Sequence, residues 1–285
     1  MSIQAPIAGT SRTRVWAIIR HVFDEFSNDR IPSVAASITF FFLLALFPAI
    51  ACVASIYGLF ADRGTIANEL RLVSSFLPEG AVSVLRTDFM RLAAMPAERF
   101  NIGFITALTL AIWSASGGIK ALIEGLNIAY ATRETRSFFR LTLHALMLTV
   151  IAVMFGAVLI AFAVTLPPIV ERLPPDNWFA VSCRILVWPL AFAACSVMSQ
   201  LIYRYGPNRA HTKWRWITWG STIASAAWMT GTFLFSWYVA KFGHYNEMYG
   251  SLGSIVGFLT WIWLSLLVLL LGAEINAAIE QADWT

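Results

Sequence analysis

The sequence predicts an all-α polytopic membrane protein with six transmembrane helices in a single membrane domain, residues 1–285. Hydrophobic residues make up 58% of the chain and charged residues only 13%, and the mean hydropathy is +0.69. A soluble domain of this length carries about a quarter charged residues. Six long apolar runs without Asp, Glu, Lys or Arg alternate with charged segments. A helix needs about 20 such residues to cross a bilayer.

Residues 1–30 predict a cytoplasmic arm that contains an amphipathic helix. Arg14 and Arg20 are available to lipid head groups. Such a helix lies on the membrane surface, and packing against the helical bundle is an equally open alternative. The apolar positions recur at helical spacing: Val15, Trp16, Ile18, Ile19, Val22, Phe23 and Phe26.

The six apolar runs are each interpreted as a spanning helix, because hydrocarbon cannot satisfy an open backbone hydrogen-bonding group. Pro48 lies in the first run and Pro189 in the fourth, which predicts kinks in both helices. In chain order the runs are Val34–Tyr57, Ile102–Ile119, Leu141–Leu166, Ile185–Tyr203, Ile217–Tyr238 and Tyr249–Ala273.

Residues 62–100, between the first and second runs, form the longest segment expected outside the membrane. Two sets of apolar residues at helical spacing flank the turn Pro78–Gly80, which predicts two short amphipathic helices. They are expected to form a helical cap on the external face. Residues 274–285 are expected to form a cytoplasmic tail.

The basic residues predict the orientation. The N-terminal arm and the second and fourth loops hold twelve Lys and Arg residues, against eight in the other loops. Cytoplasmic loops carry the excess of Lys and Arg, so both termini are expected in the cytoplasm.

Motifs for enzymes and for nucleic-acid binding are missing from the sequence. There is no HExxH, GxSxG or P-loop, so we expect no catalytic residues, no metal, no cofactor and no ATPase of the chain's own. Cys52, Cys183 and Cys195 have no CxxC spacing. No clustered basic face predicts a nucleic-acid partner. Any transport would be passive, coupled to an ion gradient or driven by a partner.

A few polar residues near the predicted helix ends are candidates for function, because an ionisable group at membrane depth is costly unless it is paired or hydrated. Glu274 follows the last run, where it would lie at the inner mouth. Lys120 and Glu124 are one helical turn apart and can pair or line that mouth. Ordinary interfacial anchoring is the alternative for each. His144 suggests a hydrogen-bonded imidazole, with a proton relay as the alternative.

Small residues predict where helices pack closely. They cluster in Ser33–Ser37, in Gly220–Ala227, and at Gly250, Gly253 and Gly257. Such faces let helix backbones approach one another, so the first, fifth and sixth helices are expected to form the packed centre. The alternative is a groove for an elongated apolar substrate.

Several blocks in order resemble the YihY/BrkB family of bacterial inner-membrane proteins. The resemblance implies six helices, cytoplasmic termini and location in the inner membrane. The family carries ribonuclease and virulence-factor labels, and transport of a lipid or lipid-linked molecule is the usual suggestion. The blocks are Pro32–Phe41 with Pro48, Leu126–Tyr130, Glu134–Arg136, Tyr203–Asn208, Tyr249–Gly253 and Gly272–Asn276.

The function hypothesis is an inner-membrane transporter or flippase-like protein for a lipid-like or amphipathic substrate. Membrane lipids are the expected partners, and a homo-oligomer is left open. A non-transporting scaffold of envelope machinery and, less favoured, a membrane-tethered ribonuclease are the alternatives. The candidate substrate-binding or gating residues are Glu274, Asn276, Tyr249, Gly250, Asn127, Arg204, Pro207, Asn208, Lys120 and Glu124.

Overall fold

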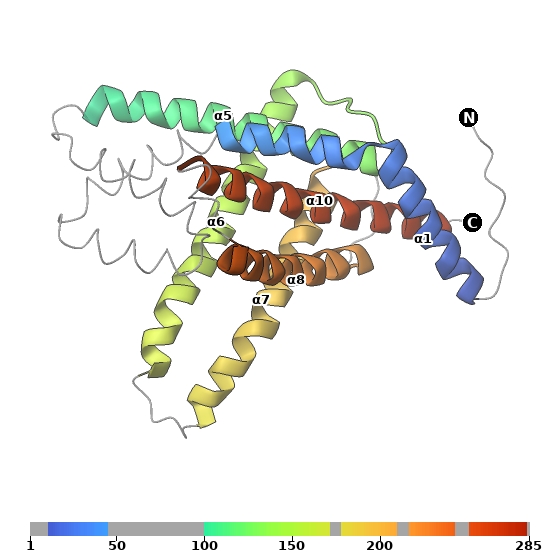
Figure 1. Ribbon diagram of the computed structural model, residues 1–285. Helices are drawn as coiled ribbons and strands as arrows, with labels where there is room; N and C mark the ends of the chain where they lie inside the picture. The colour runs from blue at the N-terminus through green and yellow to red at the C-terminus, as the bar shows by residue number, and fades with distance from the viewer. Residues whose placement is uncertain (1–10, 45–99, 172–177, 210–216, 243–250, 284–285) are drawn as a thin grey trace.

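The protein is an all-α polytopic membrane protein (Figure 1). The computed structural model describes residues 11–44, 100–171, 178–209, 217–242 and 251–283, and no strand occurs among them. The helices are α1 (Ser11–Asn28), a helix at Ile31–Leu44, α5 (Phe100–Ala129), α6 (Phe138–Glu171), α7 (Trp178–Tyr205), α8 (Trp219–Phe242) and α10 (Ser251–Asp283).

A helix occupies each of the six predicted positions, although the first is described only as far as Leu44. By length and composition, three segments of the described chain are sufficient to cross a membrane: Phe138–Gly156, Ile185–Tyr205 and Ile255–Ala282. The count of six spans therefore stays a prediction. Pro189 lies inside α7. The predicted external cap lies outside the described residues except for Phe100, which begins α5.

The packed centre of the fold is α10, with α8 along one side. The predicted close approach of the fifth and sixth helices is confirmed at Gly220 of α8, which lies against Gly272 of α10. The prediction is wrong at Gly257, which has no neighbouring atom within 4 Å of where a Cβ would lie. In the described parts of α8 and α10, close packing is therefore seen where Gly220 and Gly272 come to the same level.

The helix Ile31–Leu44 joins this centre through its larger side chains. Ala35 is fully buried, whereas Ser33 and Ser37 are exposed, because a period of 3.6 residues turns them away from the contact face. A Cβ on Gly125 of α5 would lie 3.1 Å from the Ile38 side chain. The small residues of this segment therefore contribute less to packing than the sequence predicts.

A pair of helices, α6 and α7, extends side by side beyond the layer that contains α5, α10 and α8 (Figure 1). Their apolar side chains are exposed along this extension, including Met154 at 61% and Trp188 at 67%. Exposed large apolar side chains over whole helices are unfavourable in water and favourable in lipid. The apolar exterior of α6 and α7 is therefore the kind of surface that lipid solvates.

The predicted amphipathic helix is α1, and it uses two faces. Val22 is buried and Phe26 packs against the core, while Trp16 and Phe23 are 72% and 74% exposed. The helix packs against α10. Packing against the bundle is therefore confirmed for one face, and the exposed aromatic face is left for the surface interaction that the sequence also predicts.

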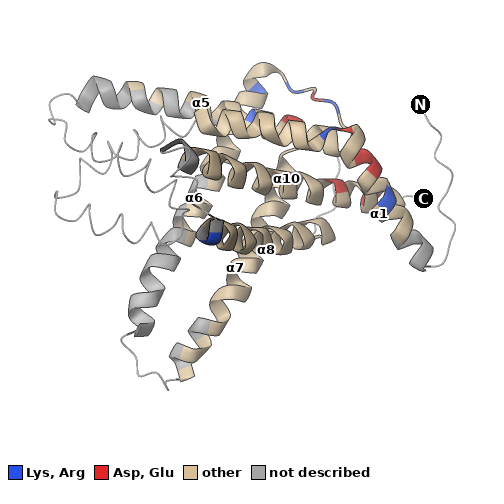
Figure 2. Cartoon of the chain, in the orientation of Figure 1, with Lys and Arg blue, Asp and Glu red and all other residues tan. Residues whose placement is uncertain are grey.

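Charged side chains of the described chain gather at one end of the molecule (Figure 2). This end holds α1, the segment that links α5 to α6, and the C-terminal part of α10. The chain turns from α1 into the next helix at Arg30, whose φ of 50° is left-handed. That turn ends α1 and brings Asp29 close to α10.

Candidate functional site

Asn127, near the C-terminal end of α5, organises one cluster of the predicted site residues. It is 5% exposed. Its Nδ2 donates to Glu134 Oε2 at 3.0 Å, and its Oδ1 accepts from the Asn208 backbone N–H at 2.7 Å. Thr132 Oγ1 donates to the same Oδ1 at 3.1 Å. Every polar atom of this amide therefore has a protein partner.

Asn208 completes the cluster from the segment that follows α7. Its Nδ2 donates to the Arg133 carbonyl at 3.0 Å and to Thr135 Oγ1 at 2.7 Å. Arg136 donates to the Gly206 carbonyl at 3.3 Å, and Pro207 is buried. These contacts tie the segment after α5 to the segment after α7. We interpret them as a structural clasp, because both amide atoms of Asn127 and the Nδ2 of Asn208 are bonded to the protein.

Arg209 and Arg204 lie beside this clasp. Arg209 forms an ion pair with Glu280 at 2.6 Å and donates to the Tyr203 carbonyl at 2.8 Å. Its guanidinium lies 3.8 Å from the centre of the Tyr130 ring, a cation–π contact. The sequence did not single out Arg209. The Arg204 guanidinium lies 5.5 Å from the centre of the Tyr205 ring.

Asn276 of α10 supports the start of α8. Its Oδ1 accepts from the Gly220 backbone N–H at 2.9 Å, and its Nδ2 donates to Thr218 Oγ1 at 2.9 Å. Thr218 in turn donates to Gln200 Oε1 of α7 at 2.7 Å. The first N–H groups of a helix lack partners within it, so Asn276 caps α8 from a neighbouring helix. This predicted site residue joins three helices.

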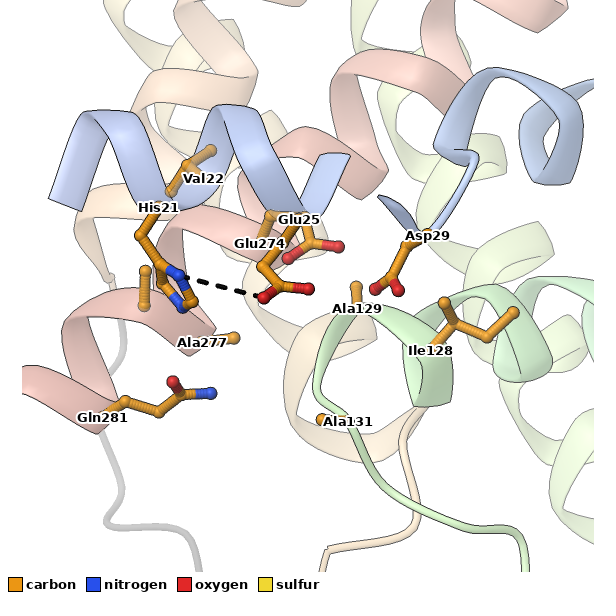
Figure 3. Close-up of a pocket in the computed structure, with 11 residues that line it drawn as sticks. His21, Val22, Glu25, Asp29, Ile128, Ala129, Ala131, Glu274, Ala277 and Gln281 are labelled. Atoms are coloured by element: carbon orange, nitrogen blue, oxygen red, sulfur yellow. Dashed lines mark ion pairs between the residues drawn. The ribbon is translucent and has the colours of Figure 1, made fainter. Parts of the chain in front are cut away.

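Glu274, two residues before Asn276, faces a cavity of about 220 Å³ (Figure 3). Its side chain is only 4% exposed, and Oε1 has no hydrogen-bond partner. We call this space the acidic cavity. It is lined by His21, Val22, Glu25, Asp29, Ile128, Ala129, Ala131, Glu274, Ala277, Ala278 and Gln281.

Three carboxyl groups converge on the acidic cavity (Figure 3). Glu25 comes from α1, Asp29 from the turn after it, and Glu274 from α10. Burial raises the pKa of the Asp29 carboxyl, the Glu25 charge adds to the rise, and a hydrogen bond with Glu274 acts against it. His21 Nδ1 lies 3.9 Å from Glu25 Oε1. The end of α5 contributes the apolar side chains of the lining.

The lining residues differ from those of an anion site and of a metal site. None of the described residues that line the acidic cavity is a Lys or an Arg. Over the described ranges, no group of three or more His, Cys, Asp or Glu side chains is arranged to hold a metal ion. The cavity thus presents several hydrogen-bond acceptors and negative charge with few donors.

The remaining predicted residues lie elsewhere. Lys120 lies 4.7 Å from the centre of the Phe138 ring, and Glu124 is exposed. Neither residue lines the acidic cavity. In the described structure no ion pair joins the two. His144 Nε2 hydrogen-bonds to the Tyr205 carbonyl, which confirms the predicted hydrogen-bonded imidazole. Tyr249 and Gly250 lie outside the described residues.

The acidic cavity includes four polar residues that sequence reasoning missed: His21, Glu25, Asp29 and Gln281. The available signal was spacing, because His21, Glu25 and Asp29 are each one helical turn apart. Spacing alone could not show that this face of α1 lies against Glu274.

The fold and its charged end define a polytopic helical membrane protein, and comparison with known proteins gives its family. The model of the virulence factor BrkB family matches residues 22–284. The chain belongs to this family, as the ordered sequence blocks predicted.

Two relatives illustrate what the chain is similar to. A ribonuclease-like protein of Bacillus subtilis (strain 168), YfkH, is 27% identical over 271 residues, which cover 93% of this chain and 96% of that protein. A UPF0761 membrane protein of Tolumonas auensis is 25% identical over 261 residues, which cover 89% and 82% of the two chains. No solved structure matches the chain.

Proposed function

We propose that this protein is a transporter or flippase-like protein of the bacterial inner membrane that moves a lipid-like or amphipathic substrate without an ATPase of its own. The observation that carries the proposal is Glu274. A long apolar helix, α10, brings a buried carboxyl with an unpartnered oxygen to a cavity at the charged end of the fold. Ionisable residues in such helices mark substrate and ion pathways.

The two regions of the fold suit the two parts of an amphipathic substrate. The acidic cavity provides polar contacts at one end, and the exposed apolar surface of α6 and α7 provides contact with lipid chains. Both termini would lie in the cytoplasm, since the charged end holds the basic linker between α5 and α6. The acidic cavity would then open on the cytoplasmic side.

The printed name of the Bacillus relative suggests RNA cleavage as another function. The acidic cavity argues against RNA as its ligand, because three carboxyl groups repel a phosphate backbone. The scaffold alternative gives no role to the unpartnered Glu274 oxygen. Neither alternative is favoured by a specific contact in the described structure.

Reconstitution tests transport directly. Purified full chain is placed in vesicles that contain a phospholipid with a fluorescent acyl chain, and dithionite bleaches the probe in the outer leaflet. We expect probe from the inner leaflet to become accessible faster than in protein-free vesicles. Glu274→Gln should slow this exchange by about tenfold, the effect of one lost charge-assisted hydrogen bond.

Asp24→Asn is the matched control, because Asp24 lies on α1 and is exposed but does not line the acidic cavity. This variant should exchange lipid at the wild-type rate. Exchange no faster than in protein-free vesicles, from protein whose unfolding transition shows that it is folded, would contradict the proposed function.

A further inference from the structure

We propose that the acidic cavity binds the primary ammonium group of an organic cation. The inference rests on the proposed function and deepens it, since it assigns a positively charged amine to the polar part of the substrate. It concerns the space enclosed by α1, the end of α5 and the C-terminal part of α10.

Charge is the first step. Glu25, Asp29 and Glu274 face one space, and among the described residues that line it the only basic side chain is His21, which lies beside Glu25. Ionised carboxyl groups at close range repel one another, and burial makes that repulsion stronger. A cation that enters the cavity therefore removes an unfavourable interaction that none of the described lining residues offsets with a Lys or Arg side chain.

Hydrogen bonding is the second step. Glu274 Oε1 is buried and unpartnered, and a buried acceptor without a donor is unfavourable. The carboxyl groups of Glu25 and Asp29 and the amide of Gln281 supply further acceptors. A primary ammonium has three N–H donors and no acceptor, so it matches this set. A quaternary ammonium has the charge without the donors.

Size is the third step. A cavity of about 220 Å³ is larger than a proton or a single water molecule needs, given a water volume of about 30 Å³. The lining also includes the apolar side chains of Val22, Ile128 and Ala129. These methyl and methylene groups suit the carbon atoms that an organic cation carries beside its nitrogen. The described side chains do not form a metal site.

Protonation competes with this ligand. Burial and the nearby Glu25 charge raise the pKa of the Asp29 carboxyl, so this group holds a proton to a higher pH than an ordinary aspartate does. The titratable groups that face the cavity are His21, Glu25 and Asp29 from α1 and its turn and Glu274 from α10; the end of α5 contributes none. A bound ammonium favours the ionised form of the carboxyl groups around it, so binding should release a proton and weaken as the pH falls.

Calorimetry on the purified full chain in a neutral detergent tests the proposal, with n-propylammonium as the probe. We expect saturable binding at neutral pH, with release of a proton in buffers of different ionisation enthalpy. Glu274→Gln and Asp29→Asn should each weaken binding by about tenfold or more, because each removes a charged acceptor. Asp24→Asn should bind as the wild type does.

Two matched compounds separate the contributions of charge and donors. 1-Propanol has the same carbon chain without charge, and tetramethylammonium has the charge without N–H donors. Both should bind at least about tenfold more weakly than n-propylammonium. Equal binding of 1-propanol, or equal binding of tetramethylammonium, would overturn the assignment of a primary ammonium.

Three further results would also overturn the ammonium assignment. One is the absence of saturable binding to folded wild-type protein, and another is wild-type affinity in both Glu274→Gln and Asp29→Asn. The third is proton uptake by the cavity's carboxyl groups without any binding of the amine. If Glu274→Gln fails to fold, Asp29→Asn and Glu25→Gln at the edge of the cavity decide the question. Binding is measured without transport, so a negative transport result leaves the inference standing. A negative binding result leaves a transporter of an uncharged or anionic substrate.

Discussion

Gly272 sets how closely α10 approaches α8. A Cβ at this position would lie 2.7 Å from the Ala224 Cβ and 2.8 Å from the Gly220 carbonyl oxygen. Both atoms belong to a packed helix, so neither can move without separating the two helices. The same close approach brings Asn276, one turn further along α10, to the start of α8. Glu274 lies between them in the sequence but on the opposite face of the helix, where it lines the acidic cavity.

Gly272→Ala should therefore destabilise the fold. We expect a loss of about 1 to 3 kcal/mol in the free energy of unfolding, the cost of overpacking a close contact. Gly231→Ala is the matched control on α8, where a Cβ meets no atom within 4 Å; it should be neutral or slightly stabilising. Unfolding in mixed detergent measures both, and an equal effect of the two substitutions would refute the prediction.

Asp29 should make stability depend on pH. Its pKa in the folded protein is raised above the ordinary value, first by burial and then by Glu25. The folded state therefore binds the proton more tightly than the unfolded state does. The stabilisation is fully present below the ordinary Asp pKa and is lost as the pH rises through the folded pKa.

Asp29→Asn isolates this effect because asparagine stays neutral. We expect the variant to unfold at a higher temperature than the wild type at pH 7.5, and the difference to shrink as the pH is lowered toward 4. Asp24→Asn controls for charge on the exposed face of α1. A difference that grows toward acidic pH would have the wrong sign.

At the scale of elements, α1 lines the acidic cavity on one side and exposes aromatic residues on another, which we predict to contact the membrane surface. Its buried side holds Val22 against the core, its polar side brings Glu25 to the cavity, and its open side carries Trp16 and Phe23. Aromatic side chains this exposed on an amphipathic helix are stabilised at the boundary between head groups and acyl chains. A movement of α1 would therefore change the cavity and the lipid contact together.

Spin labels on α1 test this arrangement. With Cys52, Cys183 and Cys195 replaced, a label at position 23 in reconstituted protein should be more accessible to oxygen, which partitions into lipid, than to a water-soluble nickel complex. A label at position 24, on the neighbouring exposed polar side, should show the reverse preference. Equal accessibility to the nickel complex at both positions would place the aromatic face in water.

At the scale of the whole molecule, the first and last described helices meet at the same end. Val22 of α1 and Ala277 of α10 line one cavity, and the charged side chains gather there (Figure 2). Lys and Arg remain on the cytoplasmic side during insertion. The arrangement supports the proposal that both termini lie in the cytoplasm.

Reporter fusions check that orientation. A fluorescent protein that folds only in the cytoplasm should be bright at either terminus, and alkaline phosphatase, which needs the external side, should be inactive at both. An active phosphatase at one terminus only would require an odd number of spans. Active phosphatase at both would invert the orientation and move the acidic cavity to the external side.

Local features of the sequence were sufficient for the class of fold. Uncharged runs of membrane length predicted helices at α6, α7 and α10, and the spacing of apolar residues predicted α1. Each of these predictions depends only on residues that lie within a few turns of one another in a single helix. Glu274 was also found locally, as a carboxyl at the end of an apolar run.

The roles of the candidate residues required contacts between distant segments. Asn127 and Asn208 are 81 positions apart and form a clasp, and Asn276 caps α8 through the Gly220 N–H, 56 positions earlier. All three were selected as binding candidates because a sequence does not reveal which amides have partners. Asp29 and Glu25 were missed because nothing local shows which face of α1 turns toward α10.

The sequence by itself determined that this is a helical membrane protein of the BrkB family, which end of it is charged, and that a lone carboxyl follows its last apolar run. Only the tertiary structure decided that this carboxyl meets two others in an enclosed space. The amino-acid composition of a segment and the spacing of its apolar residues depend only on that segment and its solvent. The meeting of the carboxyl groups depends on how segments hundreds of residues apart pack, because the contact of α1 with α10 and the turn at Arg30 bring Asp29 and Glu274 to one cavity.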